Sequence, residues 1–313
     1  ILLEQMWIIV IVIKGFRIIA KEKITNLLVI PDQGSLLIAA YLMHRLSGLP
    51  LHIHMTDFWE EMLCDRIRKI AAKLFEKRIF KSANKISVIN DYLKNYYMGK
   101  YHVRAELIPN SVILEDYKNA TPIDLNTDGN KSIIYTGNVW IPQISSLVDM
   151  CTVVNSLEGI KFLVYTDRSS TELKQKGIYG KNVLVRFARP SEIPAIQKTA
   201  DILYLPLAFD TPFPTYIDSV SPSKMPEYMA AGKPILVYAP KTSYIANYAK
   251  QHGFACVVKE RSHDELKEAL LTLLKDKRVR EETVKKSKIL VMQFDTISVS
   301  SKLQEILKYQ VVS

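Results

Sequence analysis

The segment "SPSKMPEYMAAGKPILVY", residues 221–238, carries the local signals for a loop, a short helix and a buried strand. Ser223 suits the N-cap of the helix, because Pro226 then occupies the third helical position, where its missing N–H breaks no hydrogen bond. A helix that starts at Ser221 is the alternative, but it places Pro226 inside the hydrogen-bonded ladder. Gly232 suits the left-handed residue that ends a helix, and the apolar run after it is typical of a buried strand.

This helix is expected to connect two parallel strands, because the upstream run "ADILYLPL", residues 200–207, also predicts a buried strand. In such sheets, ligands bind beyond the carboxyl ends of the strands and near the N-termini of helices. Lys224 and Glu227 lie three positions apart in the first turn of the helix. Both charges are therefore predicted to face a ligand at that edge of the sheet.

Strand and helix signals alternate along the whole chain, which predicts an α/β protein with parallel sheets. The expected strands are 27–30, 51–55, 85–89, 105–109, 132–137, 161–165, 183–187, 201–205, 234–238 and 254–258. The expected helices include 1–20, 35–46, 58–80, a helix from residue 92 and a helical C-terminal part from residue 262. We therefore expect two Rossmann-like, doubly wound domains.

The boundary between these domains is predicted from a loss of periodicity in residues 110–130, which are rich in Asn, Asp and Thr. The first domain is expected over residues 1–112, the linker over 113–130 and the second domain over 131–290. Residues 291–313 are expected to form a C-terminal helix that crosses back to the first domain. Because the sequence begins with an isoleucine, we expect the natural N-terminus to be missing and the first domain to be incomplete.

Composition narrows the class of protein. With 48% apolar and 24% charged residues, the chain is typical of a globular protein, and its longest apolar runs are shorter than the roughly 20 residues of a spanning helix. Cys64, Cys151 and Cys256 form no C-x-x-C motif, which indicates free thiols in a reducing compartment. The expected location is therefore the cytoplasm.

The net charge of +10 is concentrated in residues 66–85. Helical spacing aligns five cations on one face of this helix, whereas Ile67, Ala71, Leu74 and Phe75 lie on another. The five cations are Arg66, Lys69, Lys73, Lys77 and Lys81. An ordinary solvated face explains this pattern, and so does peripheral contact with an anionic membrane at its inner, cytoplasmic surface. A nucleic-acid partner is not expected, because no aromatic residues or known binding motif accompany the lysines.

The chemistry that suits Lys224 and Glu227 is recognition of a nucleoside diphosphate sugar. A fixed cation and free N–H groups at a helix start stabilise a diphosphate leaving group, and one carboxylate accepts hydrogen bonds from both ribose hydroxyls. The chain contains no D-x-D motif, so we expect no metal and no cofactor besides the donor substrate. The simpler alternative is a surface ion pair within the helix, which stabilises it by a few tenths of a kcal/mol.

Two-domain α/β proteins of this plan include dehydrogenases and nucleotide-sugar transferases. The chain has only 11 glycines and no G-x-G-x-x-G, so it lacks the dinucleotide fingerprint. The segment 221–236 resembles the donor site of GT-B glycosyltransferases, particularly the retaining family 4. "ELIPNSVI" (106–113), "SIIYTGN" (132–138) and "ADILYLPL" resemble the family's other segments, and the resemblance covers roughly residues 27–275.

The resemblance implies roles for individual residues of the second domain. It makes Glu227 the ribose ligand, Lys224 the diphosphate cation and Ser223 a further diphosphate contact, with Ser221 in the same donor loop. Gly137 and Asn138 would approach the phosphates through their backbone. Many members carry another glutamate at the position of Ser219, and an Arg and a Lys where this chain reads "NVWIPQ". Arg189 is therefore a candidate second cation.

A second cluster, "HIHMTDFW" (52–59), lies at the end of a strand in the first domain. His52 and His54 share one face of this strand, and Asp57 follows it. The resemblance implies that Asp57, or else His54, faces the sugar and orients it, while the leaving phosphate acts as the base. A metal site would need a third ligand at zinc spacing, which the sequence lacks, and a hydrogen-bonded core histidine explains His52.

These features predict a hexosyltransferase that acts on a saccharide or lipid-linked acceptor held by the first domain, in the synthesis of polysaccharide or glycoconjugate at the cell surface. Two alternatives stay open at this point. A sugar-nucleotide epimerase of the same two-domain plan would convert the donor without an acceptor. A non-catalytic nucleotide-sugar-binding module would bind the donor without turnover.

Overall fold

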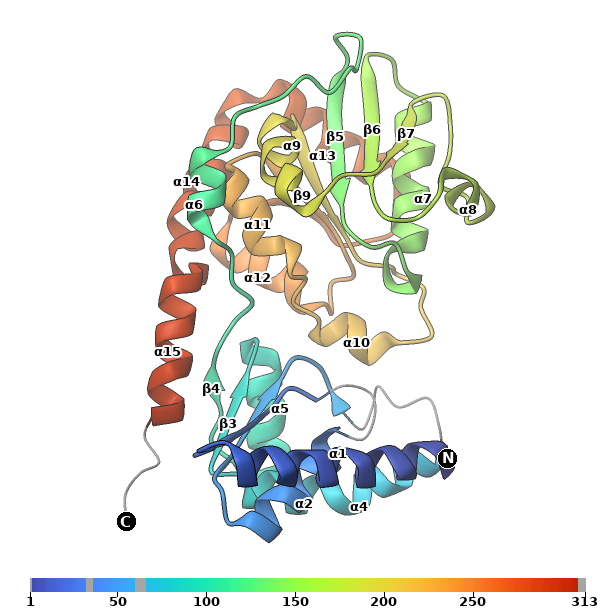
Figure 1. The fold of residues 1–313 in the computed structure, drawn as a ribbon. Helices are drawn as coiled ribbons and strands as arrows, with labels where there is room; N and C mark the ends of the chain where they lie inside the picture. The colour runs from blue at the N-terminus through green and yellow to red at the C-terminus, as the bar shows by residue number, and fades with distance from the viewer. Residues whose placement is uncertain (1, 32–35, 60–65, 309–313) are drawn as a thin grey trace. The chain divides into compact units, whose positions relative to one another are not determined.

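The computed structural model describes residues 2–31, 36–59 and 66–308 and divides the chain into two compact units. The first unit comprises Ile1–Pro109 and Val299–Ser313, and the second comprises Asn110–Ser298. Each unit has its own sheet (Figure 1). Residues 113–130, predicted as a linker, group with the second unit, and the last part of the chain groups with the first.

The first unit contains a parallel four-stranded sheet in the order β1-β2-β3-β4. The strands are β1 (Leu27–Val29), β2 (Leu51–Met55), β3 (Lys85–Val88) and β4 (Glu106–Leu107). The helices are α1 (Leu2–Lys21), α2 (Leu36–Ser47), α4 (Arg66–Ser82) and α5 (Asp91–Tyr101). Because side chains alternate across a strand, one face of β2 carries Ile53 and Met55 into the core and the other carries the histidines. No helix in the described ranges is long and apolar enough to cross a bilayer.

Helix α4 turns a different face to the core than its sequence pattern predicted. Leu74 and Phe75, expected on the apolar inner face, are 65% and 39% exposed. The residues that are buried instead are Ala72, Glu76, Ile79 and Phe80. Ile67 and Ala71 are on the described helix, but their side chains lie outside the described part. The sequence pattern predicted the wrong inner face because α4 has two apolar stripes, and the stripe that packs on the core includes Glu76.

Glu76 is tolerated in the core because two side chains of α5 satisfy it. Tyr101 Oη donates a hydrogen bond to Glu76 Oε2, and Lys100 Nζ lies 3.2 Å from the same oxygen. A buried carboxylate without such partners would destabilise the fold by several kcal/mol. Both partners lie more than 20 residues from Glu76 in the sequence, so local periodicity does not reveal them.

The second unit contains a parallel six-stranded sheet in the order β10-β9-β8-β5-β6-β7. The strands are β5 (Lys131–Thr136), β6 (Ile160–Tyr165), β7 (Val183–Arg186), β8 (Ile202–Pro206), β9 (Ile235–Tyr238) and β10 (Cys256–Val258). The strand order reverses at β5, which pairs with β6 on one side and β8 on the other. Ligands bind at such a switch point, beyond the carboxyl ends of the strands.

Helices cover both faces of this sheet (Figure 1). They are α6 (Leu114–Asn119), α7 (Ile141–Asn155), α8 (Ser170–Gln175), α9 (Ile193–Thr199), α10 (Pro214–Ser219), α11 (Lys224–Ala231), α12 (Tyr244–His252), α13 (His263–Lys275) and α14 (Lys277–Leu290), with 3-10 turns at Pro190–Glu192 and Val291–Phe294. Helix α15 (Thr296–Lys308) follows. Ile133 and Ile134 belong to opposite apolar clusters, as expected when a strand is buried on both sides.

Candidate functional site

Helix α11, which carries the predicted donor-site residues, spans Lys224–Ala231 and ends at Gly232 in the left-handed conformation (φ 65°), as the sequence predicted. Ser223 directly precedes the helix, but the predicted capping bond is wrong. Its backbone is already helical (φ −59°), so its side chain accepts no bond from the first turn. The N–H of Met225 donates to Pro222 O at 3.0 Å instead.

Lys224 reaches from α11 to the end of β5. Its Nζ donates a hydrogen bond to Tyr135 Oη at 2.9 Å and lies 4.2 Å from the centre of that ring. Tyr135 Oη in turn donates to Asn138 O at 2.6 Å. Burial lowers the pKa of Lys224, while Tyr228 and Glu227 raise it. The ammonium is thus held at the turn after β5 by a neutral hydroxyl and a ring, which leaves its charge available to an anion.

Gly137 is required at this turn for two reasons. Its φ is 120°, a conformation that side-chain-bearing residues rarely adopt. A Cβ at this position would also lie 3.1 Å from Lys224 Nζ and 3.2 Å from Lys224 Cε. The structure therefore brings together Gly137, Asn138 and Lys224, which the sequence had placed at the phosphate-binding region from two separate segments.

Glu227 is half-buried on the same helix as Lys224. Its Oε2 accepts a hydrogen bond from Gln197 Nε2 at 3.3 Å. Burial raises the pKa of the carboxyl, while the bond from Gln197 and the charge of Lys224 lower it. A half-exposed carboxylate held by one donor retains acceptor capacity for two vicinal hydroxyls.

Three residues at this site were not predicted. Tyr135 holds Lys224, Gln197 holds Glu227, and Arg168 Nε lies 3.4 Å from Asn138 Oδ1. Arg168 follows β6, the strand beside β5, and also pairs with Glu172 at 3.4 Å. A cation shortly after an apolar strand was the available signal for Arg168, but the strand order that places it beside Asn138 is not readable from the sequence.

Two of the other predicted donor residues lie less centrally. Ser221 is buried, and its backbone oxygen accepts a hydrogen bond from Asn110 Nδ2 at 2.9 Å. Arg189 is exposed and follows β7, which is separated from β5 by β6. Ser219, which replaces the glutamate common in the resembled family, donates to Tyr216 O within its own helix at 3.3 Å.

The predicted pair on β2 shares one hydroxyl on β3. Ser87 Oγ lies 2.9 Å from His52 Nε2 and 2.8 Å from His54 Nδ1. Burial lowers the pKa of both imidazoles to about 4, so both rings are neutral at pH 7. His52 Nδ1 is buried and has no partner among the described residues. An unpaired acceptor is less costly than an unpaired N–H, which favours protonation of His52 at Nε2 and of His54 at Nε2.

Asp57 lies two residues beyond the end of β2, where the sequence predicted it. Burial raises the pKa of its carboxyl to about 6. Tyr97 Oη donates to the backbone oxygen of Asp57 at 3.5 Å, which ties this loop to α5. The carboxyl is therefore ionised at neutral pH but titrates well above an ordinary aspartate.

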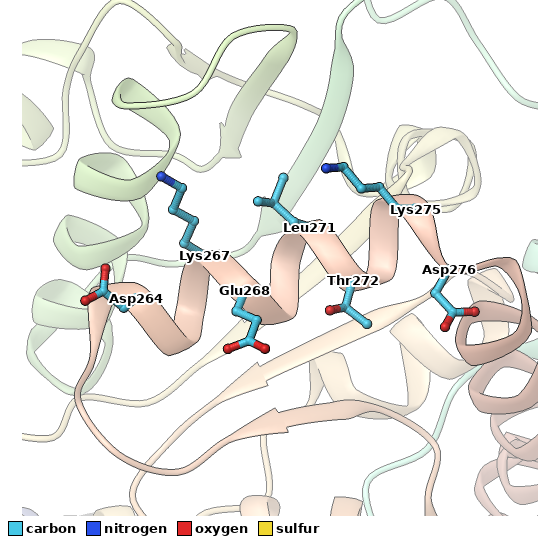
Figure 2. Close-up of a pocket in the computed structure, with 7 residues that line it drawn as sticks. All are labelled: Asp264, Lys267, Glu268, Leu271, Thr272, Lys275 and Asp276. Atoms are coloured by element: carbon cyan, nitrogen blue, oxygen red, sulfur yellow. The ribbon is translucent and has the colours of Figure 1, made fainter.

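Metal-ligand groups and pockets outside the predicted site are the other kinds of site that the described residues could form. No group of three His, Cys, Asp or Glu side chains among them is arranged to hold a metal ion. An open pocket runs along α13, and Figure 2 shows the seven side chains that line it. They are Asp264, Lys267, Glu268, Leu271, Thr272, Lys275 and Asp276. All belong to α13 or the residue after it, and none is a predicted site residue.

Comparison with known proteins gives a family for the second unit and a fold for the chain. Residues 130–276 match the family described as glycosyl transferases group 1. No curated protein matches the sequence. Among solved structures, HepE of Anabaena in complex with UDP-glucose has a TM-score of 0.69 and 14% identity over 90% of this chain and 78% of that one.

Two further solved structures have the same fold at similarly low identity. A glycosyltransferase of Rickettsia africae has a TM-score of 0.71 and 13% identity over 97% of this chain and 82% of that one. The sucrose-phosphate synthase of Thermosynechococcus elongatus has a TM-score of 0.70 and 13% identity over 95% and 76%. The expected α/β architecture with two parallel sheets is thus confirmed. Residues 130–276 match glycosyl transferases group 1, and the chain has the GT-B fold of the glycosyltransferases.

Proposed function

We propose that this glycosyltransferase moves a hexose from a nucleoside diphosphate sugar to a saccharide or lipid-linked acceptor, with retention of configuration and without a metal, in the synthesis of cell-surface polysaccharide or glycoconjugate. The observation that carries the proposal is the position of Lys224 above Gly137, with Glu227 less than one helical turn away. Both lie where ligands bind in a sheet whose strand order reverses at β5.

In this proposal, the bond between the anomeric carbon and the diphosphate oxygen breaks while the acceptor hydroxyl bonds to the same face of the sugar. The hydroxyl proton passes to the leaving phosphate oxygen. Negative charge develops on the diphosphate, and the Lys224 ammonium stabilises it, with Arg168 beside Asn138 as a second cation. Glu227 accepts hydrogen bonds from the ribose. HepE, which has a similar fold, is known in complex with UDP-glucose.

Asp57 is proposed to orient the transferred sugar through a hydrogen bond, with His54 as a further donor. The carboxylate is the acceptor form, and the raised pKa of about 6 means that this form is lost in mildly acidic solution. His54 would donate from Nε2, because its Nδ1 is occupied by Ser87. An Asp57→Asn variant with undiminished turnover would exclude this role.

The acceptor is proposed to be lipid-linked because of the exposed surface of α4. The side chains of Lys69, Lys73, Lys77 and Lys81 are exposed on this helix, and so are Ile70 at 52% and Leu74 at 65%. Cations interleaved with exposed apolar side chains suit the headgroup region of an anionic membrane. The side chain of Arg66, the fifth cation of the predicted stripe, lies outside the described residues.

The donor site is tested by calorimetric titration of UDP, ADP and GDP against the wild-type chain and a Glu227→Ala variant. We expect one nucleotide to bind and the variant to lose about 2 to 4 kcal/mol of affinity, because two hydrogen bonds to a charged acceptor disappear. Glu268→Ala, on the surface of α13, is the control and should bind normally. Equal affinity of wild type and Glu227→Ala, or no binding of any of the three nucleotides, would contradict the proposal.

A further inference from the structure

A buried side-chain amide joins four elements of the second unit behind the proposed donor site. Gln197 of α9 is fully buried, and each of its polar atoms has a partner. Its Oε1 accepts a hydrogen bond from Tyr117 Oη of α6 at 2.7 Å. Its Nε2 donates to Thr136 Oγ1 of β5 at 2.9 Å and to Glu227 Oε2 of α11 at 3.3 Å.

The Glu227 carboxylate determines which way this amide points, and Tyr117 holds the oxygen end of the amide. The pKa of Tyr117 is raised far above its ordinary value, chiefly by burial and also by the charge of Glu227, so the phenol keeps its proton and can donate it to Gln197 Oε1. An amide turned by 180° could still bond to Tyr117, whose oxygen can accept from Nε2, but it would direct Oε1 at the carboxylate of Glu227 and leave two acceptors facing each other. Only the observed orientation satisfies all three partners.

Thr136 holds the other amide hydrogen and is itself fixed. Its N–H donates to Tyr228 Oη at 2.9 Å, and its hydroxyl lies 3.3 Å from the same oxygen. Thr136 directly precedes the Gly137 turn on which Lys224 lies. The amide of Gln197 is therefore anchored at both ends, and its remaining hydrogen has a fixed direction toward Glu227.

We propose that Gln197 is a positioning residue that holds the Glu227 carboxylate in one orientation for a ribose, and that Tyr117 acts through Gln197 by holding the oxygen end of its amide. The inference rests on the proposed role of Glu227. A free glutamate side chain loses rotamer freedom when it binds a ligand, whereas one already held by a donor loses less. One bond to Oε2 also leaves Oε1 and the second lone pair of Oε2 for the two ribose hydroxyls.

The same bond affects ionisation of the carboxyl. Burial raises the pKa of Glu227, and Gln197 and Lys224 oppose this effect. The other titratable groups around the carboxyl are the phenols of Tyr117 on α6 and Tyr228 on α11, which stay neutral near pH 7 because burial raises their pKa. Without the amide, the pKa of Glu227 rises further, so the protonated form, which binds ribose less well, appears at higher pH.

The test is calorimetric titration with the nucleotide, among UDP, ADP and GDP, that binds the wild-type chain most tightly. Gln197→Met, which keeps the side-chain length, should weaken affinity about tenfold, since a hydrogen bond to a charged group is removed. Tyr117→Phe, which removes one hydroxyl, should weaken it by about threefold. The Tyr117→Phe variant keeps the proposal testable if the Gln197→Met variant does not fold.

Two matched controls separate positioning from loss of stability. Asn182→Leu removes another buried amide, which donates to Val154 O and Leu157 O, and Tyr204→Phe removes another buried hydroxyl, which donates to Ser146 O. Both should lower the thermal midpoint without changing nucleotide affinity. Equal losses of affinity in the controls and in Gln197→Met would reduce Gln197 to a stabilising residue and overturn the proposal.

A cycle with Glu227→Ala distinguishes the failure of this inference from failure of the donor-site proposal. Adding Gln197→Met to Glu227→Ala should cause no further loss, because the residue acts through the carboxylate. A tenfold further loss would show that Gln197 acts otherwise. If Glu227→Ala alone is harmless, the donor-site assignment fails instead. The acid limb of affinity against pH should also move upward in Gln197→Met, and an unmoved limb would contradict positioning.

Discussion

At the scale of single residues, the proposed donor site combines a half-buried cation with a glycine that makes room for it. Lys224 is held by Tyr135 rather than by a carboxylate, so its charge is not neutralised by a direct ion pair within the described site. Gly137 permits the approach because it lacks a Cβ and adopts φ 120°. A cation held in place in this way suits a diphosphate, because it can stabilise the negative charge without a rearrangement of the lysine side chain.

Gly137→Ala should weaken nucleotide affinity about tenfold, because a displaced Lys224 loses a charged contact with the diphosphate of about 1.5 kcal/mol. The added Cβ would lie 3.1 Å from Lys224 Nζ, so the side chain must move. Gly129→Ala is the matched control, since Gly129 also has a positive φ (75°) but nothing within 4 Å of the added atom. The control should lose stability and keep its affinity, and equal affinities for both variants would contradict the argument.

Lys224→Ala should reduce turnover at least a hundredfold, because it removes charge stabilisation from the leaving group. Transfer by the wild-type chain should persist in the presence of a chelator. Lys233→Ala, two residues beyond the C-terminal end of α11, is the control and should retain activity. An absolute requirement for added magnesium or manganese would overturn the proposed metal-independent mechanism.

At the scale of elements, α11 and α4 differ in what decides their orientation. Met225, Tyr228 and Met229 make one apolar stripe on α11, and all three are buried. Helix α4 offers two stripes, and packing against α5 selects the one that contains Glu76. The stripe that stays outside includes Ile70 and Leu74, next to the lysines.

The exposed stripe of α4 should bind anionic vesicles in a salt-dependent manner. Each cation near such a surface contributes up to about 1 kcal/mol, and the Debye length falls from about 10 Å at 0.1 M salt to about 3 Å at 1 M. Sedimentation with neutral and anionic vesicles measures the binding, and Lys73, Lys77 and Lys81 are changed together to Gln.

The matched control changes three exposed lysines of the second unit, Lys174, Lys181 and Lys250, to Gln. This control should sediment with anionic vesicles like the wild type, whereas the α4 variant should stay in the supernatant. Equal binding to neutral and anionic vesicles, or identical behaviour of the two triple variants, would contradict membrane binding. The basic face of α4 would then be an ordinary solvent-exposed surface.

At the scale of the whole molecule, each unit has its own parallel sheet and apolar core, and the chain returns to the first unit after residue 298. The first unit contains two neutral histidines, the buried His52 and the half-buried His54, so its stability depends on pH. The pKa of His52 is about 4 in the folded chain against 6.5 for an ordinary histidine. The unfolded state therefore binds more protons between these values, and folding loses stability as pH falls through that range.

His52 alone should cost the first unit about 2 kcal/mol of stability between pH 7 and pH 5. Urea unfolding at both pH values measures this, with buried Trp59 as the fluorescent probe in a Trp7→Phe, Trp140→Phe background. His52→Gln should be less stable at pH 7, since it loses the bond to Ser87, but its stability should change less with pH. Exposed His102, changed to Asn, is the control, and an unaltered pH dependence in His52→Gln would refute the argument.

Local signals were sufficient for the strands, for α11 with its glycine end, and for the shared face of His52 and His54. These features depend on neighbours within a few residues, where periodicity and the conformational limits of Pro and Gly act directly. The same signals placed Lys224 and Glu227 on one helical turn. The capping role of Ser223 failed because the turn at Pro222 supplied a backbone acceptor instead.

Tyr135, Gln197 and Arg168 required the tertiary structure, because their partners lie 30 to 89 residues away. Each partner is brought near by the pairing order of β5, β6 and β8 or by the packing of α9 against α11. The inner face of α4 depended likewise on residues of α5. Sequence periodicity specifies which side chains share a face, whereas the choice of face, and of the polar partners buried behind it, is made by contacts between distant segments that bury apolar area and satisfy hydrogen bonds together.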